Sequence, residues 1–181
     1  LAFGGAAEYF GIRPDMVTYG KIIGAGMPVG AYGGRKEIME MVSPAGPVYQ
    51  AGTLSGNPIA MAAGLTQLKY LYAHQEVYKD LEAKGEKLYG GMREILKKTG
   101  SPYQINYVSS LGSIFFAEEE VKDYTSAKTS DTKAFAQYFL YMLKNGVHLA
   151  PSQFEAMFLS IAHTDKIIEE TLEKVQNYFT K

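Results

Sequence analysis

The 181-residue sequence contains no cysteine, no tryptophan and only three histidines. Without cysteine the chain has no disulfide, no thiolate metal site and no cysteine nucleophile. Three widely spaced histidines argue against a histidine-based metal centre. The 18 basic and 19 acidic residues give a formal net charge of -1, so the sequence offers no basic field for nucleic acid or an anionic membrane. We expect no metal and no nucleic-acid partner.

Long apolar runs are also absent. The longest candidate, residues 22–34, is interrupted by five glycines and a proline and is too short to span a bilayer. The first residues have neither the positive segment nor the apolar segment of a signal peptide. We therefore expect no membrane association and a cytoplasmic location in a bacterium. A protein of the plastid stroma with its transit peptide and first half removed would look the same in these respects.

What the sequence does contain is typical of an ordered globular chain, with 46% hydrophobic and 20% charged residues. Its composition changes near residue 64. Residues 1–64 hold 13 of the 19 glycines but only 8 of the 37 charged residues. The first part is therefore predicted to have a closely packed backbone. The remainder is predicted to form amphipathic elements with solvated faces.

Strand and helix patterns alternate along the chain, which predicts an α/β or α+β class. Asn57 and Pro58 mark the start of a long helix as N-cap and first helical residue, and residues 59–68 are apolar enough to be buried around most of their circumference. Strands are predicted at 14–19, 31–34, 104–108, 113–117, 147–149 and 157–160, and helices at 35–41, from 58, from 77 to about 100, over 135–145 and from 165.

Lys21 is the most informative single residue, because it carries the only charge between Asp15 and Arg35 and is flanked by glycines. Apolar surroundings disfavour a charged amine and make it a usable nucleophile. Lysine also forms Schiff bases with carbonyl cofactors such as pyridoxal phosphate, and glycines allow a planar ring to approach the backbone. A solvent-exposed lysine at the end of a strand is the alternative.

Three other positions could belong to a site. The segment Gly52–Pro58 combines small residues, hydroxyls and a helix start, which suit a phosphate but equally describe a turn and a helix cap. Tyr49 lies in the loop before it and could line a pocket. Glu155 is an acid within an apolar aromatic run, where it either forms a turn or faces a cavity.

Three segments, TYGKIIGAGMPVGAYGG, PAGPVYQAGTLSGNPIAMAAGL and APSQFEAMFLSIAHT, closely resemble the glutamate-1-semialdehyde 2,1-aminomutase family within the class III aminotransferases. The resemblance runs along the whole chain but covers only the C-terminal part of that family's sequences. It implies the C-terminal part of a fold type I transferase that depends on pyridoxal phosphate. Residues 1–60 would end the large cofactor-binding sheet domain, 61–98 would be connecting helices, and 99–181 would form a small α/β domain.

The resemblance also implies roles for individual residues. Lys21 matches the lysine that binds pyridoxal 5'-phosphate and moves protons between two substrate carbons. Gly52 and Thr53 match the segment that reaches the phosphate of the partner's cofactor in a homodimer. Tyr49 matches an aromatic at the entrance of the active site, and Glu155 matches an acid near the substrate, in place of the arginine of ordinary aminotransferases.

The implied reaction converts glutamate-1-semialdehyde into 5-aminolevulinate for tetrapyrrole synthesis, with the pyridoxamine form of the cofactor as amine donor. The residues that pair with the pyridine nitrogen and hold the phosphate in the same subunit fall outside the matched part, so we expect these 181 residues alone to be inactive. Two alternatives remain, namely a class III aminotransferase for ω-amino or ornithine-like substrates, and an inactive fragment or interaction module.

Overall fold

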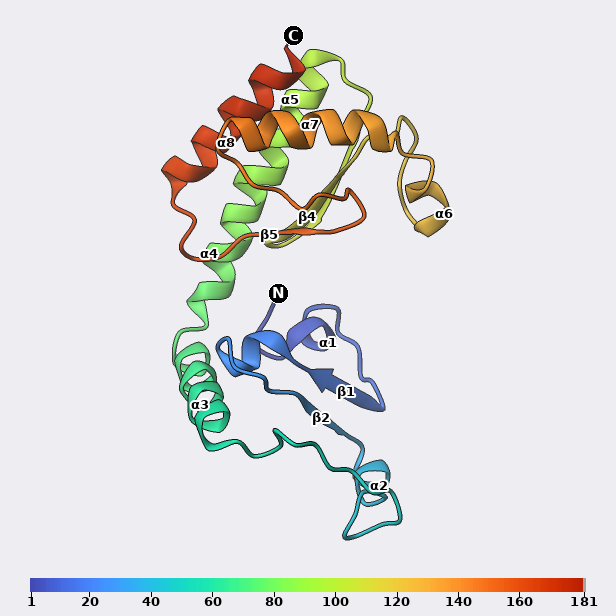
Figure 1. Ribbon diagram of the computed structural model, residues 1–181, viewed down its shortest axis with the longest axis vertical. Helices are drawn as coiled ribbons and strands as arrows, with labels where there is room; N and C mark the ends of the chain where they lie inside the picture. The colour runs from blue at the N-terminus through green and yellow to red at the C-terminus, as the bar shows by residue number, and fades with distance from the viewer. Residues whose placement is uncertain (181) are drawn as a thin grey trace. The chain divides into compact units, whose positions relative to one another are not determined.

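The computed structural model describes residues 1–180, and these separate into two compact units (Figure 1). The N-terminal unit holds Ala2–Glu76, and the C-terminal unit holds residues 77–180 together with Leu1. The boundary falls within the segment 61–98 that the sequence analysis assigns to connecting helices. Both units mix helices with small antiparallel sheets, in keeping with the predicted α/β class.

The N-terminal unit is built on a two-stranded antiparallel sheet. Strand β1 (Met16–Tyr19) pairs with β2 (Ala31–Gly34), with Met16 opposite Gly34 and Tyr19 opposite Ala31. Both strands lie where the sequence predicts them. The helices of this unit are α1 (Gly5–Tyr9), the 3-10 helix η1 (Lys21–Gly24), α2 (Lys36–Met39) and α3 (Pro58–Ala73).

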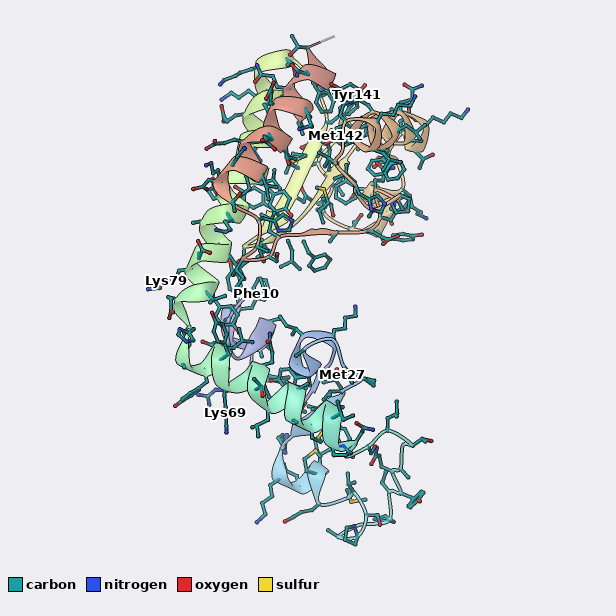
Figure 2. All side chains as sticks on the ribbon, turned by 60° about the vertical axis from the view of Figure 1, so that its left-hand side comes forward. Phe10, Met27, Lys69, Lys79, Tyr141 and Met142 are labelled. Carbon is teal, nitrogen blue, oxygen red and sulfur yellow. The ribbon has the colours of Figure 1, made fainter. Side chains whose placement is uncertain are left out.

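Helix α3 confirms the predicted start but not the predicted burial. The Asn57 side chain accepts hydrogen bonds from the backbone N–H groups of Ile59 and Ala60, both at 3.1 Å. Only Ala60, Gly64 and Leu71 are buried, whereas Ile59 is 67% exposed. The prediction is wrong for residues 1–180, because α3 packs against η1 and the Phe3 ring but most of its residues are exposed. Figure 2 shows Lys69 projecting from this helix.

The C-terminal unit begins with a continuous helical segment and contains a three-stranded antiparallel sheet in the order β3-β4-β5. The elements of this unit are α4 (Glu76–Gly85), the π-helix η2 (Glu86–Gly90), α5 (Gly91–Thr99), β3 (Gln104–Val108), β4 (Leu111–Phe115), α6 (Tyr124–Ala127), α7 (Thr132–Lys144), β5 (Met157–Phe158) and α8 (Asp165–Phe179). Helix α8 lies beside α5 (Figure 1).

The main core of the molecule lies in this unit, between its helices and the sheet. Tyr89, Tyr138 and Met142 are almost entirely buried, and Figure 2 labels Met142 on α7. The Phe116 ring contacts Tyr138 at 5.6 Å between centroids and Phe135 at 6.0 Å. Large aromatic side chains therefore provide much of the apolar area that stabilises the unit.

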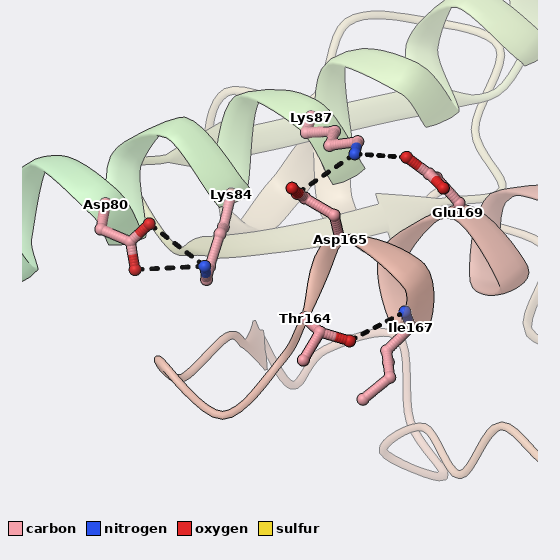
Figure 3. Close-up of polar contacts among 7 residues, drawn as sticks. All are labelled: Asp80, Lys84, Lys87, Thr164, Asp165, Ile167 and Glu169. Carbon is pink, nitrogen blue, oxygen red and sulfur yellow. Dashed lines mark hydrogen bonds and ion pairs between the residues drawn. The ribbon is translucent and has the colours of Figure 1, made fainter.

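Polar contacts tie α8 to the helical segment that opens the unit (Figure 3). Lys87 Nζ lies 3.1 Å from an Asp165 carboxylate oxygen and 2.6 Å from one of Glu169. The hydrogen bonds that Lys87 donates to Glu169 and Asp165 raise its pKa. Because both acids are exposed, these pairs orient α8 more than they stabilise it.

Two strand predictions need correction. Residues 147–149 are not a strand, because the N–H of Val147 bonds to the Met142 carbonyl at 2.9 Å and closes the end of α7. Strand β4 spans Leu111–Phe115 rather than 113–117, and Val108 pairs with Leu111. The short helices α1 and α6 were not predicted, since each is only four or five residues long.

Candidate functional site

Lys21 stands where strand β1 turns into η1. Gly20 is fully extended, and Lys21 then adopts a positive φ of 52°. A non-glycine residue in this left-handed region is strained by about 1–2 kcal/mol, and such strain gathers at functional sites. The Lys21 side chain is exposed, so the apolar surroundings expected from the sequence are not supplied by residues 1–180.

Helix α3 supports the segment that follows Lys21. A Cβ atom added to Gly64 would lie 2.7 Å from the Ile23 carbonyl oxygen, so helix and η1 touch backbone to backbone. Gly24 is buried against Val29, where an added Cβ would lie 3.1 Å from the Val29 Cβ. Glycine is required at these close approaches, which explains two of the glycines in the first part of the chain.

The glycine-rich loop before α3 forms a turn in which Ser55 N–H bonds to the Gly52 carbonyl at 2.9 Å. Gly52 lies at the edge of a hollow of about 710 Å³, whose polar lining includes Thr18, Gln50 and Ser55. A Cβ added to Gly52 would approach Ser55 Oγ at 2.9 Å. The loop thus presents backbone and hydroxyl groups of the kind that bind phosphate.

The remaining predicted residues do not line this hollow. Thr53 and Tyr49 are exposed, Tyr49 at 82%, and neither Thr53 nor Lys21 lines the hollow that includes Gly52. Glu155 lies in the C-terminal unit, on the loop between α7 and β5, where it is exposed and borders a small cavity. Gly52 and Ser55 thus line the hollow together, whereas Lys21 does not.

Two polar residues near these sites were missed by the sequence analysis. Thr18 lines the hollow from strand β1, and Gln153 is buried two residues before Glu155. A threonine in a strand and a glutamine in a loop carry no signal of their own, because both are common in ordinary structure. Within residues 1–180 no cluster of three or more potential metal ligands occurs, and no helix is long and apolar enough to cross a membrane.

The chain belongs to the class-III aminotransferase family, whose sequence model matches residues 3–179. Within the family, the chain is 58% identical over 178 residues to glutamate-1-semialdehyde 2,1-aminomutase 1 of Lachnoclostridium phytofermentans, a match that covers 98% of this chain and 42% of that protein. The chain thus spans about two fifths of the length of that curated relative.

Solved structures agree with the family assignment. A β-phenylalanine aminotransferase from Variovorax paradoxus superposes with a TM-score of 0.88 at 29% identity, covering 98% of this chain and 41% of that one. A transaminase with pyridoxal phosphate bound superposes with a TM-score of 0.80 at 26% identity, covering 97% and 41%. The two units together therefore correspond to part of a fold type I transferase.

Proposed function

We propose that this chain supplies the cofactor lysine and part of the substrate site of an aminomutase that converts glutamate-1-semialdehyde into 5-aminolevulinate. Lys21 carries this proposal: it is a strained lysine at the end of β1, in a sequence 58% identical to a glutamate-1-semialdehyde 2,1-aminomutase. Substrate and product are isomers, so the reaction needs no external amine donor or acceptor.

The residues present fit pyridoxal or pyridoxamine 5'-phosphate. The Lys21 amine suits the cofactor's aldehyde carbon, and the Gly52–Thr53 segment offers backbone and hydroxyl donors for its phosphate. When bound, the cofactor supplies the amino group and draws electrons from the substrate carbon that loses a proton. Lys21 Nζ would deliver a proton to the substrate carbon that gains the amine and then take one from the carbon that loses it, as general acid and then base.

Glu155 would lie beside the substrate and orient its amino groups. A carboxylate attracts an ammonium and repels the carboxylate of a second dicarboxylic substrate. Tyr49, exposed on the loop before Gly52, would border the entrance. These roles together favour an internal exchange of the amine over transfer to a separate keto acid.

We also propose a homodimer in which Thr53 serves the partner's cofactor. The support is that the hollow containing Gly52 does not include Lys21 and that Thr53 is exposed. A loop placed this way is free to donate its hydroxyl and backbone N–H groups across a two-fold axis.

The activity test uses the complete holoenzyme with glutamate-1-semialdehyde and no keto acid. We expect 5-aminolevulinate to form, Lys21→Arg to lower kcat by about 10²–10⁴-fold, and the exposed-lysine control Lys36→Arg to retain activity. An absolute requirement for 2-oxoglutarate would instead support a class III transaminase, the alternative favoured by the 0.88 TM-score with a β-phenylalanine aminotransferase.

The dimer test mixes two inactive variants, Lys21→Ala and Thr53→Asp. If Thr53 acts across the interface, each mixed dimer contains one site with both wild-type residues. Random reassociation then restores about a quarter of wild-type activity, since half of the dimers are mixed. No recovery after proven subunit exchange would show that Thr53 serves its own subunit's cofactor.

A further inference from the structure

Gln153 is buried in a loop whose neighbouring residues are exposed. Its side chain is 2% exposed, whereas Phe154 beside it is 49% exposed and Glu155 is also exposed. The loop thus turns an amide inward and a phenylalanine outward. This is the reverse of what burial of apolar area favours. Burial of the amide therefore requires hydrogen bonds that compensate for its loss of water.

One half of that amide has a clear partner. Gln153 Oε1 accepts a hydrogen bond from the backbone N–H of Phe116 at 3.2 Å, one residue beyond the end of β4. This bond fastens the loop that carries Glu155 to the sheet. The other half is unpaired: Gln153 Nε2 is a buried donor with no partner among the described residues. Buried donors are nearly always satisfied by protein or by ordered water.

Gln153 also lines a small cavity. Its volume is about 10 Å³, and its polar lining consists of Gln153, Ser152 and Glu155, with Ile114, Phe135 and Met157 among its apolar walls. That volume is at the lower limit for one water molecule, which also needs two or more polar partners. Gln153 and Glu155 both line this cavity, and their side chains carry a donor and an acceptor.

We propose that Gln153 is a positioning residue for Glu155. Its Oε1 holds the loop on β4, and its Nε2 donates to one ordered water, which in turn donates to the Glu155 carboxylate. This inference rests on the proposed function, in which Glu155 lies beside the substrate. Gln153 then sets the direction of that carboxylate without touching the substrate itself.

The water is tested by a high-resolution crystal structure of the holoenzyme, a readout independent of activity. We expect a fully occupied water within hydrogen-bond distance of both Gln153 Nε2 and a Glu155 oxygen. An empty cavity, or a direct bond from Nε2 to a protein oxygen, would overturn the bridging role.

The positioning role is tested with Gln153→Met, which keeps the side chain's length, and with Gln153→Glu, which keeps the acceptor for Phe116 but lacks the donor. The control is Gln137→Met, at an exposed glutamine of α7. We expect both Gln153 variants to raise the KM for glutamate-1-semialdehyde by about 5–10-fold with kcat within about twofold, a loss of uniform binding, and the control to behave as wild type. An unchanged KM in Gln153→Glu, which retains the loop's bond to β4, overturns the proposal even if Gln153→Met fails to fold.

A double-mutant cycle separates positioning from general stability. If Gln153 acts through Glu155, then Gln153→Glu adds nothing to the KM of Glu155→Gln, whereas independent effects multiply. Multiplying effects would contradict the proposal. If the wild-type enzyme does not convert the semialdehyde at all, the proposed function fails, while the crystallographic test of the water still stands by itself.

Discussion

At the residue scale, Lys21 combines an isolated charge with an unusual backbone conformation. Lys21 is conspicuous because it is the only charge in a glycine-rich stretch, and its positive φ adds strain at the same place. Gln153 could not be predicted, since burial of a loop glutamine depends on an acceptor bond to Phe116, 37 residues away in the sequence. Sequence alone gives no sign of such a contact.

Tyr89 shows how burial of one residue affects stability. The phenol lies in η2, fully buried, and donates hydrogen bonds to the carbonyls of Met157 at 3.0 Å and Ser110 at 3.4 Å. Burial raises the pKa of Tyr89 well above its ordinary value. The unfolded chain therefore releases this proton first as the pH rises. The stability that the neutral phenol contributes is complete below about pH 10 and falls above it.

We predict that Tyr89→Phe has two effects on the free energy of unfolding. At neutral pH the variant loses about 1 kcal/mol, because two carbonyls lose their donor. Above pH 10 its stability declines less steeply than that of the wild type, although the burial that raises the pKa of Tyr138 still contributes to the decline. Urea unfolding at pH 7 to 11 measures both effects, with Tyr124→Phe, at a 72% exposed position, as control. Parallel pH curves for Tyr89→Phe and wild type would refute this account.

At the element scale, helix ends could be predicted because local chemistry decides them. Asn57 caps α3 as expected, and Gly100 ends α5 in the left-handed conformation. Packing between elements could not be predicted. The close contact of Gly85 with the hairpin turn is an example, since a Cβ there would lie 1.8 Å from the Ser109 carbonyl oxygen. The apolar sequence of α3 was correctly recognised, but its packing partners depend on tertiary structure.

At the scale of the whole molecule, the two units differ greatly in their cores. All buried hydrophobic residues except Ala60 and Leu71 belong to the C-terminal unit. The N-terminal unit instead exposes large apolar side chains such as Ile22, at 64%, and Tyr72, at 69%. The change in composition near residue 64 indicated that the two parts of the chain differ in character. It did not indicate that one of them would have so small a core.

We predict that residues 77–181 fold by themselves. Their core contains aromatic and aliphatic side chains from helices and sheet, which is sufficient for a domain of about 100 residues. The expected result is a cooperative thermal transition and slow hydrogen exchange in α7. In the 181-residue chain, the amides of α3 should exchange much faster than those of α7. Equal protection of the two helices would contradict the unequal cores.

The central claim is that Lys21 is the residue that holds the cofactor. It is tested most directly on the purified complete enzyme. The enzyme is loaded with pyridoxal 5'-phosphate and reduced with borohydride, and its peptides are mapped by mass spectrometry. We predict one pyridoxyl group fixed to Lys21, and none there in Lys21→Arg. A pyridoxyl group on a different lysine, or on none, would contradict the account.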